Sequence, residues 1–236
     1  MHGLVLAGGE GSRLAAEGIA MPKPLVPVAG RPIILRLLET LDGLGCASLT
    51  AMVREEFREV PRLLAGHAFE HPFTIRTCRT PTSAHTLVAG LDAVPPGPVF
   101  CSMVDTIMLP SDWRAAFRAT GDWLSGQADA VLVVTPFVQD ESPLYVRCTG
   151  EGFVREVSDR PVAGGLVTGG VYGFGEVARR HAAAAVSEGV QRMRGVLRRL
   201  VEDGARVGAV EVARIVDLDH ADDLRLADQW LGGAGA

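Results

Sequence analysis

Asparagine is absent from the 236 residues, so the chain has no N-glycosylation acceptor. No apolar run approaches the ~20 residues that a membrane-spanning helix needs. The first eight residues have neither the basic leader nor the long apolar core of a signal peptide. The four cysteines are widely spaced and form no C-x-x-C pair, so neither a zinc knot nor a disulfide scaffold is indicated. Together, these absences predict a cytoplasmic protein.

Basic charge is also scarce. The chain has 23 basic and 28 acidic residues, a net charge of −5 and a pI near 5.7. This balance argues against a general nucleic-acid-binding surface, which is usually basic. Lys23, between Pro22 and Pro24, is the sole lysine, and every other basic residue is arginine. Because a compact ammonium differs physically from a planar guanidinium, the lone lysine suggests a position that needs a point charge.

Short apolar runs alternate with helical segments along most of the chain. This alternation is typical of a parallel sheet covered on both faces. Strands are expected at 4–7, 47–53, 73–78, 98–104, 130–135 and 206–212, and helices at 32–44, 55–65, 84–93, 110–119, 187–203 and 222–231. The turn-rich region between Leu144 and Phe174 predicts a small antiparallel insertion or edge. We expect one domain over residues 1–231, followed by a flexible tail at 232–236.

A glycine-rich stretch, Leu6-Ala7-Gly8-Gly9-Glu10-Gly11-Ser12-Arg13, follows the first strand. Glycines at this place let backbone N–H groups close on a phosphate or a nucleobase. The stretch is not a dinucleotide-binding fingerprint, because Leu14 occupies the third glycine position and three prolines at residues 22–27 prevent a continuous helix. No P-loop motif exists either. Residues 7–30 therefore predict a long functional loop that carries two cations, Arg13 and Lys23.

Residues 6–14 followed by residues 22–32 resemble the two-part signature of the sugar nucleotidyltransferases, the nucleoside-diphosphate-sugar pyrophosphorylases. Ser12 stands where the family usually has threonine. The resemblance implies an α/β fold of three αβα layers, with a mostly parallel, Rossmann-like sheet of the glycosyltransferase-A type. It also implies transfer of a nucleoside monophosphate from an NTP to a sugar phosphate, with release of pyrophosphate. The spacer at 15–21 is more similar to the branch that includes phosphocholine and inositol-phosphate cytidylyltransferases, which leaves the acceptor open.

The resemblance also implies roles for individual residues. It assigns Lys23 to the α-phosphate and Arg13 to the leaving pyrophosphate, which a guanidinium can hold in bidentate fashion. The residues expected to bind the nucleotide are Leu6, Ala7, Gly8, Gly9, Gly11, Ser12 and Ser83. Ser83 opens a predicted helix, so a plain N-cap role is the alternative for its side chain.

Two carboxylates are expected to hold Mg²⁺, because nucleotidyl transfer concentrates negative charge that a metal must neutralise. Asp105 ends an apolar strand at the edge where ligands bind in open parallel sheets. Residues 216–224 resemble the family's closing pattern, and by that match Asp217 is the second ligand. We interpret Asp219 instead as the cap of the helix that follows, with Asp222 in the capping-box position.

The acceptor-binding residues implied by the resemblance are Asp159, Arg160 and Gly170. Asp159 and Arg160 stand at the place of the family's Glu-Lys-Pro segment, with a solvated turn as the alternative. Gly170 closes a segment where the family's glycine lies against the sugar. His85, although helical and alone, is interpreted as structural.

Three other functions stay open at this level. The nearest is the same chemistry on a non-sugar acceptor, phosphocholine or an inositol phosphate, by a cytidylyltransferase. The second is a catalytically silent relative that binds a nucleotide sugar and regulates a partner. The third is a nicotinamide-dependent oxidoreductase, which the loop prolines disfavour. The expected partners are the NTP and sugar-phosphate substrates, without nucleic acid or membrane, and the oligomeric state is left open, a homodimer included.

Overall fold

A computed structural model of the protein describes residues 1–139, 141–162 and 164–233. The helices are α1 (Ser12–Ala16), α2 (Ile33–Gly43), α3 (Glu59–Ala65), α4 (Ser83–Ala93), α5 (Pro110–Leu124), α6 (Glu176–Ser187), α7 (Met193–Glu202) and α8 (Ala221–Gly233), with a 3-10 turn η1 (Lys23–Leu25). The strands are β1 (His2–Ala7), β2 (Pro27–Val28), β3 (Arg31–Pro32), β4 (Leu49–Arg54), β5 (Phe73–Cys78), β6 (Val99–Met103), β7 (Thr106–Ile107), β8 (Ala130–Thr135), β9 (Leu144–Cys148), β10 (Val154–Ser158), β11 (Leu166–Phe174), β12 (Val207–Glu211) and β13 (Val216–Asp217).

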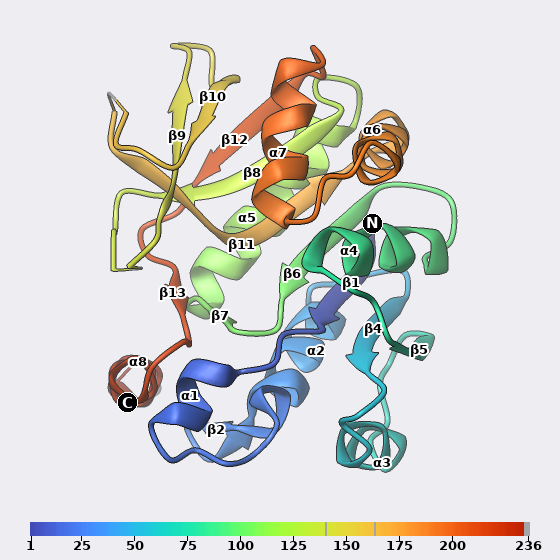
Figure 1. The fold of residues 1–236 in the computed structure, drawn as a ribbon, viewed down its shortest axis with the longest axis vertical. Helices are drawn as coiled ribbons and strands as arrows, with labels where there is room; N and C mark the ends of the chain where they lie inside the picture. Colours follow the sequence, from blue (N-terminus) through green and yellow to red (C-terminus); the bar gives the residue numbers. More distant parts are fainter. Residues whose placement is uncertain (140, 163, 234–236) are drawn as a thin grey trace.

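A central sheet runs through the molecule (Figure 1). Among the described residues it has nine strands, in the order β10-β9-β11-β6-β1-β4-β5, with β8 beside β11 and β12 beside β8. β1 pairs in parallel with β4 and β6, β4 with β5, and β12 with β8. β11 runs antiparallel to its neighbours, and β9 and β10 form an antiparallel pair beside it. The predicted α/β class, with a mostly parallel sheet and an antiparallel part, is confirmed.

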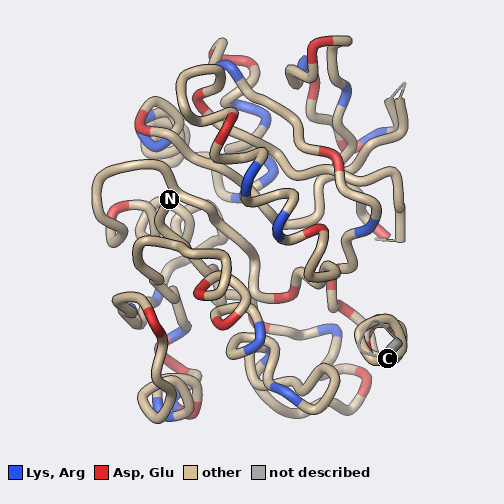
Figure 2. Tube along the Cα trace, turned by 180° about the vertical axis from the view of Figure 1, so that it is seen from behind, with Lys and Arg blue, Asp and Glu red and all other residues tan. Residues whose placement is uncertain are grey.

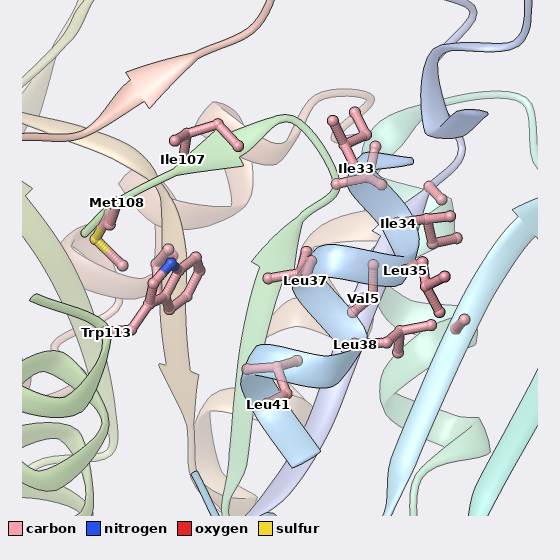
Figure 3. Close-up of a cluster of buried hydrophobic side chains, with 14 of the residues drawn as sticks. Val5, Ile33, Ile34, Leu35, Leu37, Leu38, Leu41, Ile107, Met108 and Trp113 are labelled. Atoms are coloured by element: carbon pink, nitrogen blue, oxygen red, sulfur yellow. The ribbon is translucent and has the colours of Figure 1, made fainter. Parts of the chain in front are cut away.

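Helices cover both faces of the sheet, as the apolar runs predict. Along β1, Val5 and Ala7 belong to one buried cluster, and Leu4 and Leu6 to the other, because successive side chains of a strand point to opposite faces. Figure 3 shows the first cluster, where the apolar side of α2, including Ile34, lies against β1. The second cluster joins β1 and β8 to α4, α6 and α7. The sheet is therefore the middle of three layers.

Several expected elements differ in extent. β5 and β8 have the expected bounds, whereas α5 continues to Leu124 and α3 begins only at Glu59, after a turn in which Phe57 N–H bonds to the carbonyl of Arg54. The helix expected at 187–203 starts at Met193, and α6 before it was not expected at all. The last positions of α8 are Gly232 and Gly233, and the rest of the expected tail lies outside the described residues.

The parallel strands β1, β4, β5 and β6 point the same way, so their carboxyl ends meet at one edge of the sheet (Figure 1). The segments that leave this edge include the glycine-rich stretch, the turn before α4 and Asp105. The chain returns to the same region at its other end, where α8 lies beside α1 (Figure 1). Ligand sites in open α/β sheets lie at this edge.

Candidate active site

The glycine-rich stretch turns sharply after β1. Gly11 has φ +67°, a left-handed conformation that residues with a side chain rarely adopt, and immediately precedes α1. A Cβ placed on Gly11 would lie 2.9 Å from the Cβ of Lys23, closer than atoms of this kind can approach. Glycine at this position therefore allows the turn and lets Lys23 pack against it. The expected loop at residues 7–30 is not irregular throughout, since α1, η1 and the small β2–β3 hairpin interrupt it.

Lys23 is the buried centre of the site. Its side chain is 5% exposed, and Nζ lies 2.6 Å from Oδ2 of Asp105 and 2.8 Å from Oδ1 of Asp219. Burial by itself would lower the pKa of Lys23, but the two carboxylates outweigh it and raise that pKa above its usual value. Lys23 is thus a fixed cation that bonds to two acids, which lie 82 and 196 positions further along the chain.

Arg13 reaches the same acidic group from α1. Its Nη1 lies 2.5 Å from Oδ2 of Asp219, so Asp219 bridges the two cations of the loop. Burial raises the pKa of Asp219, but Lys23 and then Arg13 counteract this, and the pKa lies below its usual value. Asp219 is therefore held as an anion.

The interpretation of Asp219 as a helix cap is wrong. Its carboxylate oxygens bond to Lys23 and Arg13, while Oδ2 of Asp223, the third residue of α8, accepts hydrogen bonds from the preceding backbone N–H groups of Asp219 (2.9 Å) and His220 (2.7 Å). Glu17, at the end of α1, accepts a further bond from the N–H of Ala221 (2.7 Å), the first residue of α8. Because other residues accept the backbone N–H groups around the start of α8, the carboxylate of Asp219 is available to Arg13 and Lys23.

Asp105 and Asp217 lie on adjoining segments. β13 pairs antiparallel with β7, which sets Asp217 opposite Thr106, and the N–H of Leu218 donates to the carbonyl of Asp105 (3.0 Å). Within the described residues no three His, Cys, Asp or Glu side chains form a metal-binding group. Two carboxylates nevertheless suit Mg²⁺, which is commonly held by one or two carboxylates together with substrate phosphates and waters. The donor chemistry of Asp105 and Asp217 therefore fits this ion.

Two cavities open on either side of this centre. The glycine-loop cavity, of about 240 Å³, lies between the ends of β1, β4 and β6 and the start of α4. Its lining is Leu6, Gly8, Gly9, Glu10, Arg54, Thr80, Pro81, Thr82, Ser83, Thr86 and Met103. The Arg13 cavity lies between α1, β11 and the segment before α8. Its lining is Arg13, Thr135, Phe137, Gln139, Glu141, Pro143, Val167, Thr168, Gly169, Ile215, Asp217, Asp219, His220 and Asp223.

The residues expected to bind a nucleotide separate into two groups. Leu6, Gly8, Gly9 and Ser83 line the glycine-loop cavity. The remaining three lie on the same stretch: Ala7 is fully buried at the end of β1, Gly11 precedes α1 and Ser12 begins it.

Ser83 is not the N-cap of its own helix. Thr82 holds that position in α4, and the hydroxyl of Ser83 accepts a hydrogen bond from the N–H of Met193 (3.0 Å), the first residue of α7. His85, beside it on α4, pairs its Nδ1 with the hydroxyl of Thr82 at 2.7 Å. Ser83 thus links the strand-end segment to the helix layer and also faces the cavity.

The residues expected to bind the acceptor lie in two places, after β10 and in β11 beside Thr106. The carboxylate of Asp159, just after β10, pairs with Arg194 (2.6 Å) and Arg198 (2.8 Å) of α7. Among the described residues, neither Asp159 nor Arg160 belongs to the lining of the Arg13 cavity. Gly170 is buried in β11, where a Cβ would lie 2.4 Å from Oγ1 of Thr106, while its neighbour Gly169 does line that cavity.

Three side chains at the site had no predicted role there. The sequence predicts a cap role for Asp219 and no role for Glu17 or Arg54. Arg54 is the last residue of β4, at the same sheet edge as Asp105, so a basic residue at the end of an apolar run is a usable signal. No local signal identifies Glu17, because its partners His220 and Ala221 are about two hundred residues away.

Basic and acidic residues are interspersed along the chain trace, without a large block of one sign (Figure 2). The described residues include no helix of sufficient length and apolarity to cross a membrane. The concentrated charge at Lys23 is therefore a local feature of the sheet edge.

Comparison with known proteins agrees with the geometry. A family model described as MobA-like NTP transferase domain matches residues 3–202. The chain is 29% identical over 241 residues to the bifunctional protein GlmU of Leifsonia xyli, covering 93% of this chain and 47% of that protein. It is 27% identical over 166 residues to glucose-1-phosphate thymidylyltransferase of an Actinoplanes species, covering 69% of this chain and 53% of that protein.

Among solved structures, the inositol-1-phosphate CTP transferase from T. maritima is similar in fold. The TM-score is 0.80 at 16% identity, with 97% of this chain and 95% of that chain covered. The chain spans about half the length, or less, of the curated relatives it matches.

Proposed function

Because this chain belongs to the family of MobA-like NTP transferases, we propose that it transfers a nucleoside monophosphate from an NTP to a sugar phosphate and releases pyrophosphate. The observation that carries the proposal is the meeting of Lys23, Arg13, Asp105 and Asp219 at one edge of the sheet, with Asp217 on the adjoining strand. The similarity to a glucose-1-phosphate thymidylyltransferase supports a sugar phosphate as the acceptor. We further propose that residues 1–231 act as one nucleotidyltransferase domain.

In the proposed reaction, an oxygen of the acceptor's phosphate attacks the α-phosphorus of the NTP. A new P–O bond forms, the bond from the α-phosphorus to the bridging oxygen breaks, and its electron pair leaves with pyrophosphate. Lys23 is assigned to the α-phosphate, where a fixed ammonium opposes the charge that builds up in the transition state. Arg13, on the more exposed side, is assigned to the departing pyrophosphate.

Asp105 and Asp217 are the proposed holders of Mg²⁺, which would neutralise phosphate charge when bound. Asp105 already bonds to Lys23 in the protein, so its carboxylate keeps the ammonium in place before substrates arrive. Asp219 does the same from the other side and also restrains Arg13. We therefore assign Asp219 to positioning of the two cations and Asp217 to the metal.

The residues of the nucleotide-binding prediction belong to this proposal as well. The glycine-loop cavity is proposed to take the base, and Gly11 and Ser12 the phosphates, since backbone N–H groups at a glycine turn are free to face an anion. Asp159, Arg160 and Gly170 stay predicted acceptor-binding residues. A cytoplasmic location and a homodimer also stay predictions.

A transfer to an inositol phosphate or phosphocholine is the second candidate, supported by the fold shared with an inositol-1-phosphate CTP transferase. The test is a matrix of nucleoside triphosphates against phosphate monoesters, followed by pyrophosphate release in Mg²⁺. Turnover with a sugar phosphate is expected. Turnover with inositol phosphate or phosphocholine alone would favour the second candidate. Nucleotide binding without pyrophosphate release for any pair of substrates would indicate a regulator without catalytic activity.

The metal assignment predicts that Asp105→Asn raises the Mg²⁺ concentration for half-maximal rate by about tenfold, because one ionised ligand is lost. His85→Ala is the control, since His85 bonds to Thr82 and lies outside both cavity linings among the described residues. A Mg²⁺ titration of each variant measures the effect, and a chelator is expected to stop all turnover. Equal titration curves for the two variants would contradict Asp105 as a ligand.

A further inference from the structure

Phe137 lies just after β8 and forms part of the lining of the Arg13 cavity. The other apolar side chains of that lining are those of Pro143, Val167 and Ile215. Because the base is proposed to occupy the glycine-loop cavity, this second cavity is left for the part of the acceptor that does not react. Aromatic and aliphatic side chains are the usual lining of such a cavity and suit the C–H groups of a sugar. The ring of Phe137 is therefore one wall against which the acceptor would lie.

The guanidinium of Arg214 contacts this ring. Its Cζ is 4.3 Å from the centre of the Phe137 ring and 5.3 Å from the centre of the Trp230 ring. Neither Arg214 nor Trp230 belongs to the cavity lining in the part of the chain that the structure describes. A cation within about 6 Å of the face of an aromatic ring is attracted by the negative charge of that face. Arg214 thus joins Phe137 to α8, the helix that carries Trp230.

The chain around Phe137 is bound to the same C-terminal segment at two further points. The hydroxyl of Thr135 accepts from the N–H of Phe137 (3.1 Å) and donates to the carbonyl of Ala213 (3.1 Å). Nε2 of Gln139 donates to Oδ1 of Asp223 in α8 (3.0 Å). Figure 1 shows the chain leaving β12, passing through β13 and entering α8. The cavity wall is therefore bound to the chain between β12 and α8 on both sides of Phe137.

We propose that Arg214 is a positioning residue for the acceptor, because it holds the ring of Phe137 as one wall of the cavity. Its contact with Trp230 anchors that wall to α8. The hydrogen bonds around Phe137 fix the course of the backbone, whereas the rotamer of a half-buried ring needs a contact of its own. The guanidinium supplies that contact. This inference rests on the proposed nucleotidyl transfer for its placement of the acceptor in the Arg13 cavity.

The first experiment compares Arg214→Gln with the wild type by steady-state kinetics in both substrates. The acceptor is the one with the fastest turnover in the substrate matrix. The KM of the acceptor is expected to rise about 5- to 20-fold, as for the loss of a partly buried cation–π contact, while the KM of the NTP and kcat change less than about twofold. An unchanged acceptor KM would overturn the proposal.

Arg225→Gln is the matched control. Arg225 is an exposed arginine of α8 that pairs with Asp222, and it belongs to neither cavity lining among the described residues. The variant loses the same charge from the same region and is expected to keep both KM values. An equal rise of the acceptor KM in the two variants would assign the effect to net charge and overturn the proposal.

Two further variants separate positioning from folding. Arg214→Lys keeps a cation over the rings and is expected to bring the acceptor KM to within about threefold of the wild type. Trp230→Leu is expected to raise the acceptor KM about 2- to 5-fold, because its ring makes the longer of the two contacts. A purely structural role would lower the thermal midpoint and kcat without a selective effect on the acceptor. Equal rises of both KM values in Arg214→Gln would therefore contradict the positioning role.

A double-mutant cycle tests whether Arg214 acts through Phe137. Phe137→Leu is expected to raise the acceptor KM about tenfold, and Arg214→Gln in that background to add less than about twofold. If the two effects multiplied in the double variant, Arg214 would act on the acceptor by another route, and the proposal would be wrong.

Acceptor binding without turnover distinguishes this inference from the proposed function. Calorimetry measures the binding of glucose 1-phosphate to the wild type and to Arg214→Gln. Weaker binding to the variant, without pyrophosphate release from any pair of substrates, would keep the positioning role and remove the transferase. Pyrophosphate release with equal acceptor KM values in both proteins would keep the transferase and remove the positioning role. A wild-type protein that neither binds glucose 1-phosphate nor releases pyrophosphate would overturn both.

Discussion

The two sides of the site are held together in different ways. On the loop side, Lys23 and Arg13 bond to acids 82 to 206 positions away, and the central ammonium is almost fully buried. On the α7 side, Asp159 is half exposed and bonds to Arg194 and Arg198, which follow it by 35 and 39 positions. The buried ion pairs of the loop side therefore fix the positions of their side chains. The exposed ion pairs of the α7 side can rearrange at a small cost in free energy. We therefore expect substitutions at the residues proposed to bind the nucleotide to reduce turnover more than substitutions at the residues proposed to bind the acceptor.

The largest effect should come from Lys23→Arg. A planar fork cannot replace a compact ammonium between Asp105 and Asp219, so we expect turnover to fall about 100- to 1,000-fold, as when a transition-state donor is lost. The fold and nucleotide binding should persist, which circular dichroism and calorimetry would check. Wild-type turnover in this variant would refute both the assignment of Lys23 and the contrast between the two sides.

Gly11→Ala tests the packing of the loop rather than its charge. A Cβ there meets the Cβ of Lys23 and must also adopt φ +67°, so we expect turnover to fall about 10- to 100-fold through displacement of the ammonium. Gly43→Ala in α2 is the control, since Gly43 has open space and no positive φ, and it should leave turnover unchanged. If both variants kept full turnover, the close approach of Gly11 to Lys23 would have no role in catalysis.

Arg160→Ala should have a smaller effect, on the acceptor alone. We expect the KM of the acceptor to rise about 3- to 10-fold, with the KM of the NTP unchanged, as for the loss of one exposed charge-assisted bond. Arg155→Ala, at an exposed position of β10, is the control. Steady-state kinetics in both substrates measure this. An unchanged acceptor KM would place the acceptor's phosphate elsewhere, and Arg13 in the lining of the Arg13 cavity would be tested next.

The smallest effect concerns the contact between α1 and α8. The hydrogen bond that His220 donates to the carboxylate of Glu17 raises the pKa of His220 and lowers the pKa of Glu17. A raised histidine pKa stabilises the fold fully below its usual value of 6.5, and this stabilisation is lost as pH rises through the raised pKa. Thermal melts should therefore show Glu17→Gln less stable than wild type near pH 6, with the gap shrinking by pH 9. A gap that is constant with pH would exclude the ion pair as its cause.

Much of the loop side could be predicted because its signals are local. A glycine turn after a buried strand and an acid after β6 identify Gly8 and Asp105 from short stretches of sequence. The role of Asp219 could not be found in this way. Its sequence neighbours make a cap plausible, and only the folded chain shows that Asp223 bonds to the backbone before α8 while Asp219 pairs with Lys23 and Arg13.

The helix layer shows a similar limit. α6 buries alanines, Ala178, Ala182 and Ala185, so it has no stripe of large apolar residues from which to predict a helix. α7, with Val196, Leu197 and Leu200 buried, was found from its periodicity, although its start was placed six residues early. Local sequence patterns do not predict a helix that packs through small side chains, or an ion pair between residues far apart in the sequence.

The bridge from Asp219 to Lys23 and Arg13 has a consequence for biosynthesis. A growing polypeptide folds from its first residues, and the glycine turn and the lysine leave the ribosome nearly two hundred residues before the acid that restrains them. In nascent chains that end before residue 219, Arg13 lacks its bond to Asp219, and Lys23 has Asp105 as its one acidic partner of the two. The two loop cations therefore reach the arrangement described above only after Asp219 has been translated.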